Sequence, residues 1–181
     1  MNKKLRALLK AKKRDRDKKI STKLGIVYAK KHETYEVLPY FDVSRKHRIC
    51  GISIKETCSS NEVLWISKED IGKDLIGYDS YRCSALINQA YASNMDIPCY
   101  DDMLRIYFNR DELNKVIALF KEYGISADTI EGPYIINDKS LESDLYSTDD
   151  ILIYHLHGNK AATYERVSIT APYLTRLVKH W

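Results

Sequence analysis

The chain has 181 residues, of which 44% are hydrophobic, enough for one compact domain or two small packed halves. It has no run of eighteen apolar residues and no signal-peptide pattern after its basic N-terminus, so neither a membrane span nor a secretory leader is expected, and the predicted location is the cytoplasm. Four scattered cysteines without a C-x-x-C pair argue against a zinc site or disulfide scaffold, and no glycine-rich loop indicates a nucleotide cofactor.

Charge is distributed unevenly along the chain. Residues 1–23 contain eleven Lys or Arg and two acidic residues, a formal charge of +9, whereas residues 24–181 carry −5. An asymmetry of this kind indicates a polyanionic partner for the basic segment.

The basic segment predicts a helical arm with two different halves. Leu5, Leu8 and Leu9 lie at i, i+3 and i+4 on one helical face, whereas every residue from 12 to 19 is charged and has no apolar face to bury. Lys outnumbers Arg eight to three, which favours contact with the phosphate backbone over readout of base edges, because Lys acts as a point charge. The predicted nucleic-acid-binding residues are Lys3, Lys4, Arg6, Lys10, Lys12, Lys13, Arg14, Arg16, Lys18, Lys19 and Lys23.

Four short strands are predicted after the arm. They are rich in Ile, Val and Tyr, and polar connectors suited to hairpins, such as residues 44–47, separate them. This pattern predicts an antiparallel β-meander, whose strands are expected at 24–30, 35–41, 48–55 and 62–66.

Two helices are expected to follow this meander. Ser67 and the acidic residues after it predict the start of a short helix that ends near Gly72 or Gly77. A second helix is predicted over residues 80–93, and Pro98 lies in a soft boundary at 94–100.

The last third of the chain predicts a mixture of strands and helices. Residues 103–108 are expected to form a strand, with Asp101 and Asp102 in a turn before it. Asn109 and Glu112 then predict a capped helix that ends at Gly124. The other predicted elements are strands at 125–130 and 151–157 and a closing helix at 170–180.

The predicted fold class is therefore α+β. The basic helical arm occupies 1–23, the antiparallel β-meander with its helices occupies 24–97, and residues 98–181 form a small, partial ferredoxin-like β-α-β-β-α half that packs on the first.

His155 and His157 are the candidate catalytic residues. Alternate residues of a strand project to the same face, and imidazole titrates near neutral pH, so the pair could act as acid and base on a phosphate or bind a metal. Asp149 and Asp150 are near enough in sequence to orient them, but further metal ligands are missing and no metal site is assigned. The alternative is that both are ordinary strand histidines.

Tyrosine is abundant, with 14 residues, and rings beside basic side chains can stack on bases. The favoured interpretation is structural, because Tyr suits half-buried positions in strands such as Tyr28, Tyr35 and Tyr40.

Three functions are compatible with these patterns. The favoured hypothesis is a non-enzymatic protein that binds RNA or DNA, free or within a nucleoprotein complex, through its basic arm. An alternative is an inhibitor of the anti-CRISPR type, encoded by a phage or mobile element, that binds a host nucleic-acid enzyme. The third is a ribonuclease that uses His155 and His157 while the arm holds the substrate.

Overall fold

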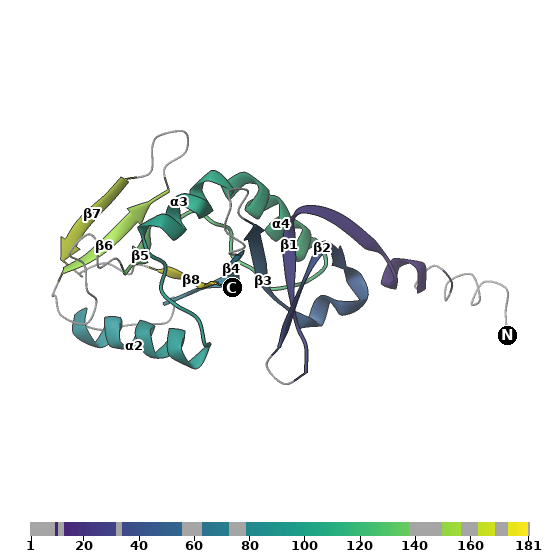
Figure 1. Cartoon of the computed structure of the whole chain (residues 1–181), viewed down its shortest axis with the longest axis horizontal. Coiled ribbons are helices and arrows are strands. Elements are labelled where there is room, and N and C mark those ends of the chain that lie inside the picture. The colour runs from purple at the N-terminus through teal and green to yellow at the C-terminus, as the bar shows by residue number, and fades with distance from the viewer. Residues whose placement is uncertain are drawn as a thin grey trace.

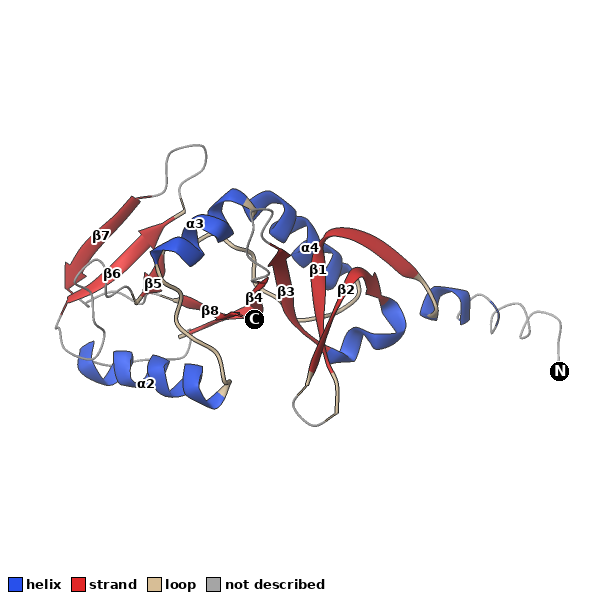
Figure 2. Cartoon of the chain, viewed as in Figure 1, coloured by secondary structure: helices blue, strands red, loops and turns tan. Residues whose placement is uncertain are grey.

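The computed structural model shows a mixed α+β protein built on a five-stranded antiparallel sheet and a smaller three-stranded sheet (Figures 1 and 2). The large sheet has the order β2-β1-β3-β4-β8, and the small one has the order β5-β6-β7. The structure describes residues 10, 13–31, 34–55, 63–72, 79–137, 150–156, 163–168 and 174–180.

The first strand begins inside the predicted arm. A helical turn at residues 13–16 leads into β1 (Lys19–Ala29), which pairs with β2 (Tyr35–Asp42) from its first residue, Lys19, opposite Asp42. The helical conformation predicted for residues 19–23 is therefore wrong, because cross-strand pairing with β2 extends the strand back to Lys19.

The four predicted strands form, but their order is not that of a meander. β1 lies between β2 and β3 (Ile49–Lys55), and β4 (Val63–Ile71) follows β3. The chain passes from β2 to β3 through a six-residue 3₁₀ helix, η1 (Val43–Arg48), and not through the predicted hairpin. The second half of β1, residues 24–29, fits this interior position, since a strand buried on both faces reads as a continuous apolar run.

The helix predicted after Ser67 is instead the second half of β4. Asp70 and Ile71 pair with Arg176 and Thr175 of β8 (Thr175–His180). Pairing with a strand more than a hundred residues away outweighs the local capping signal at Ser67.

The element predicted as a strand at 103–108 is a helix. α3 (Tyr100–Phe108) opens with a capping box in which the Asp102 side chain accepts from the backbone N–H of Cys99 at 3.0 Å. The acidic pair that was predicted to form a turn therefore supplies the first turn of this helix, where negative charge is favourable. α4 (Arg110–Glu122) confirms the helix predicted after Asn109.

The rest of this half also departs from the β-α-β-β-α prediction. Residues 125–130 form neither helix nor strand, and the closing helix predicted at 170–180 is β8 in its described part. The observed order is two helices followed by four strands: α3, α4, β5 (Tyr134–Ile136), β6 (Asp150–His155), β7 (Thr163–Ser168) and β8. Pairing with β4 holds this segment extended, and the sheet buries Leu177 and Val178 on opposite faces.

Helices cover both faces of the large sheet (Figure 2). On one face, Ile117 and Phe120 of α4 pack in a cluster with Ile26 and Ile52. On the other face, α2 (Asp79–Ala92), which matches the helix predicted at 80–93, packs in a second cluster. The division of the chain at residues 23 and 97 stays a prediction.

The small sheet is attached to the large one at β8. The hydroxyl of Thr175 donates to the carbonyl of Ile135 in β5 at 2.9 Å. The N–H of Ile135 in turn donates to the carbonyl of Leu174 at 2.8 Å. β6 confirms the strand predicted at 151–157 over its described part.

Candidate nucleic-acid interface

The described residues of the arm before Lys18 are exposed, and residues 13–16 form a helical turn. The N–H of Asp17 donates to the carbonyl of Lys13 at 3.0 Å and closes one turn, from which Arg14 and Arg16 extend into solvent. Lys10 is exposed as well. The other predicted arm cations before residue 13, which are Lys3, Lys4, Arg6 and Lys12, lie outside the described residues.

Three of the predicted arm cations contact the folded body. Lys18 Nζ donates to the hydroxyl of Tyr123 at 3.3 Å, a contact that raises the pKa of Lys18. Lys19 Nζ lies 4.9 Å from the centre of the Tyr40 ring, and Lys23 Nζ lies 3.1 Å from a Glu112 carboxylate oxygen. Lys23 is thus engaged by an acidic partner, whereas Lys18 and Lys19 stay at the root of the arm without a carboxylate bound to them.

The helix η1 adds a second group of basic residues. Asp42 caps it by accepting from the N–H and the hydroxyl of Ser44 at 3.0 and 2.6 Å. The last turn then carries Arg45, Lys46, His47 and Arg48. Such a concentration of cations at a helix C-terminus is favourable, because the carbonyl end of the helix is negative.

The fold brings η1 directly beside the root of the arm. The N–H of Val43 donates to the carbonyl of Lys18 at 3.1 Å. Lys18 and Lys46 also meet on the same residue, since Lys46 Nζ donates to the Tyr123 carbonyl at 2.7 Å. We call the resulting surface the basic patch, and its described members are Lys13, Arg14, Arg16, Lys18, Lys19, Arg45, Lys46, His47 and Arg48.

The members of the basic patch differ in how free their side chains are to contact phosphate. Arg45 is committed to Glu36 at 2.5 Å and lies over the Tyr28 ring, and it lowers the pKa of the Glu36 carboxyl. Within the described ranges, Arg14, Arg16 and Arg48 are exposed and make no ion pair or side-chain hydrogen bond. These three guanidinium groups are free to meet phosphate oxygens, which they can bind through two parallel hydrogen bonds.

The tyrosines near the basic patch are mainly structural. Tyr28 is fully buried, accepts from the Asp42 N–H at 2.7 Å and donates to the Tyr40 carbonyl at 3.3 Å. Its burial raises the pKa of Tyr28 to about 12. Tyr35 packs on Trp65, with ring centres 4.4 Å apart. Tyr40, half-buried on the edge strand β2, has the Lys19 cation at its ring, and the half-buried Tyr35 has Lys179 Nζ 5.9 Å from its ring centre.

One member of the predicted histidine pair lies within the described residues. His155 ends β6 and is half-buried, whereas His157 lies outside the described residues. The basic patch with His47 is well separated from β6, since η1 and β6 lie toward opposite ends of the long axis in Figure 1. Within the ranges that the structure describes, no cluster of three His, Cys, Asp or Glu side chains could hold a metal ion.

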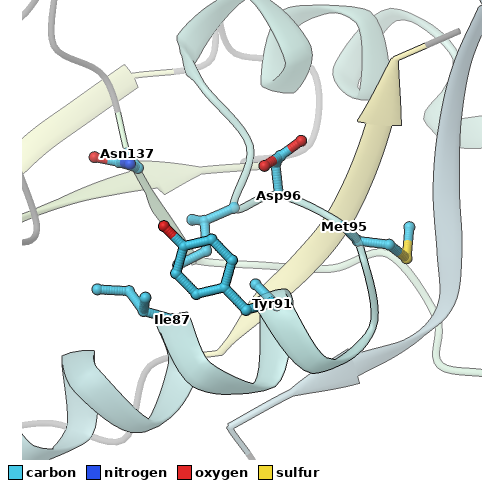
Figure 3. A pocket seen from close by; sticks show the side chains of 7 residues that line it. Ile87, Tyr91, Met95, Asp96 and Asn137 are labelled. Carbon is cyan, nitrogen blue, oxygen red and sulfur yellow. The ribbon is translucent and has the colours of Figure 1, made fainter.

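A small pocket lies between α2 and the segment before α3 (Figure 3). Ile87 and Tyr91 line one side, and the Asn137 Oδ1 atom is buried near it without a hydrogen-bond partner. The volume of about 70 Å³ would hold one or two waters of about 30 Å³ each, and it is well below the roughly 300 Å³ of the smallest usual ligand sites. The pocket is therefore too small for a metabolite.

No helix in the described part of the chain is long and apolar enough to cross a membrane.

The η1 half of the basic patch was missed by the sequence analysis, which treated residues 44–47 as a polar connector. Arg45, Lys46 and Arg48 were visible in the sequence, but their position beside Lys18 depends on β2 pairing on the outer side of β1.

The chain was also compared with known families and structures. It matches no protein-family model, no curated protein and no solved structure.

Proposed function

We propose that this protein binds the phosphate backbone of RNA or DNA through the basic patch, with little dependence on base sequence and without a catalytic step. The observation that carries the proposal is the contact between Val43 and Lys18, which places the cations of η1 beside those of the arm. Two basic segments that are separate in sequence then form one surface, as backbone binding requires.

The charge arrangement supports binding that is electrostatic and not specific for sequence. Arg14, Arg16 and Arg48 are exposed on two different elements, whereas the acidic excess lies after residue 23. The body therefore repels a polyanion and the basic patch attracts it, which favours one orientation of the bound strand.

The contribution of η1 can be tested with one matched pair of variants. We expect Arg48→Gln to weaken binding to a labelled RNA or DNA of arbitrary sequence, measured by fluorescence anisotropy at 0.1 M salt, by up to about eightfold, because one phosphate contact contributes roughly that factor at this salt. Lys55→Gln removes an exposed cation from the far end of β3 and is expected to change the affinity much less.

The arm can be tested by deleting residues 1–17, which leaves β1 intact because the strand begins at Lys19. We expect this deletion to weaken binding more than Arg48→Gln does. Equal affinities for the wild type, the deletion and Arg48→Gln would overturn the proposal.

Two further measurements distinguish this proposal from the inhibitor and ribonuclease hypotheses. Affinity for a host nucleic-acid enzyme, with none for naked RNA or DNA, would favour the inhibitor hypothesis. Cleavage of labelled RNA that His155→Ala abolishes would favour the ribonuclease.

A further inference from the structure

A groove lies next to the basic patch, between the first half of β1 and α4. Its volume is about 500 Å³. Val116 and Leu119 of α4 form an apolar base, and Ala118 on the outward side of the helix is exposed. The remaining lining residues are Ser21, Thr22, Lys23, Glu112, Lys115 and Glu122.

The irregularity of β1 explains why the groove lies here. β1 pairs with β2 up to Ser21 and again from Ile26, so the four residues between them oppose only Pro39. Proline has no N–H to donate to a neighbouring strand, and such a position favours a bulge in its partner. The backbone of β1 therefore departs from the regular sheet beside the groove.

The sequence itself offers an apolar segment for this groove. Leu5, Leu8 and Leu9 are predicted to form an apolar stripe about one helical turn long. A helix this short is marginal in water unless a surface buries its apolar face. The stripe is flanked by basic residues, and the exposed Glu122 at the groove rim offers a carboxylate to one of them.

We propose that the groove of one copy binds the Leu5, Leu8 and Leu9 stripe of a second copy, and that reciprocal exchange of the two arms forms a two-fold dimer. Each copy contributes one stripe and one groove, so the assembly is complete with two subunits. Two arm contacts then form in a single association, which loses translational and rotational freedom only once.

The direction of the chain favours a second copy over the protein's own arm. In Figure 1 the helical turn at 13–16 projects beyond the body, away from α4. Residues 17–20 connect this turn to Ser21 at the groove rim. The arm would therefore have to reverse its direction to reach its own groove.

Sedimentation velocity on the full chain tests the proposal, after bound nucleic acid has been removed and at about 0.5 M salt, where exposed charges are strongly screened. We expect the wild type to sediment with twice the mass of one chain at tens of micromolar. Leu8→Glu places a charge in the stripe and Ala118→Arg fills the groove from an exposed position, and both variants are expected to be monomers.

Asn88→Arg serves as the control, because Asn88 is an exposed residue of α2 outside the groove, and this variant is expected to remain a dimer. Circular dichroism spectra identical to that of the wild type will show that each variant is folded. A wild type that is monomeric at every concentration overturns the proposal, even if its own arm occupies the groove. So does a dimer that survives Leu8→Glu, Ala118→Arg or both.

Discussion

Arg176 donates three side-chain hydrogen bonds within the described residues and has no counterpart in the sequence-based predictions. Its Nε atom lies 2.6 Å from Asp70 Oδ1, and its two terminal nitrogens donate to the carbonyls of Ser67 and Asp128 at 3.1 and 2.8 Å. The side chains of Arg176 and Asp70 are 1% and 6% exposed. This buried pair joins β8, β4 and the segment before β5.

Removing one member of the Arg176–Asp70 pair should strongly destabilise the fold. Arg176→Met keeps the length of the side chain but leaves the Asp70 carboxylate buried without its cation, so we expect a loss of about 3–5 kcal/mol in the free energy of unfolding. Urea denaturation measures it. Lys115→Met breaks the exposed pair with Glu112 and should cost much less. Similar losses for the two variants would contradict this role of Arg176.

The Tyr28 hydroxyl has a comparable structural role at the end of β2. Tyr28→Phe removes the acceptor of the Asp42 N–H in a buried position, so we expect a loss of about 1–3 kcal/mol at neutral pH. Tyr40→Phe, on the neighbouring strand, is the matched control and should leave the free energy of unfolding nearly unchanged, because the Tyr40 hydroxyl makes no hydrogen bond within the described residues.

Tyr28 also predicts a dependence of stability on alkaline pH. Burial raises its pKa to about 12 in the folded protein, whereas an unfolded tyrosine titrates near 10. The folded state therefore holds this proton over a range in which the unfolded state has lost it, and the stability from Tyr28 falls as the pH rises from about 10 to 12. Urea denaturation across this range should show a smaller fall for Tyr28→Phe. An identical fall in both proteins would contradict the assignment to Tyr28.

At the scale of elements, local patterns succeed where pairing partners are close in sequence. The strands near 24–30, 35–41, 48–55 and 62–66 and the two helices α2 and α4 were predicted from periodicity, caps and turn residues. These signals depend on residues within one or two turns of each other, which a single sequence displays directly.

The wrong predictions concern elements whose form depends on distant partners or on an ambiguous pattern. Residues 67–71 and 175–180 pair with each other across the chain, and neither segment identifies the other. Residues 103–108 form a short, mostly apolar run, and a run of this length does not separate strand from helix. There the acidic pair before Met103 was the better signal, because acidic residues are favourable in the first turn of a helix.

The element that carries the unexpected half of the basic patch is η1, and its cap can be tested. Asp42→Ala removes the acceptor of the Ser44 N–H and hydroxyl, so we expect a loss of about 0.5–2 kcal/mol in the free energy of unfolding. Asp42→Asn keeps an acceptor oxygen and should lose less. Equal losses for Asp42→Asn and Asp42→Ala would show that charge and not capping stabilises η1.

At the scale of the whole molecule, the charge division of the sequence becomes a spatial one. The arm root and η1 gather at the end of the molecule where the chain begins, whereas the small sheet lies at the other end (Figure 1). The arm half of the basic patch could be predicted from composition, because its cations are contiguous in the sequence. The η1 half could not, because it depends on strand order.

The salt dependence of nucleic-acid affinity tests most directly whether the arm and η1 act as one phosphate-binding surface. For duplex DNA, the slope of log affinity against log salt changes by about 0.9 for each phosphate contact. The triple variant Arg14→Gln, Arg16→Gln, Arg48→Gln is therefore predicted to flatten the slope by up to about 2.7. The control Lys31→Gln, Lys55→Gln, Lys115→Gln, with the same change in net charge, should keep the wild-type slope. Equal slopes for the two triple variants would contradict the account.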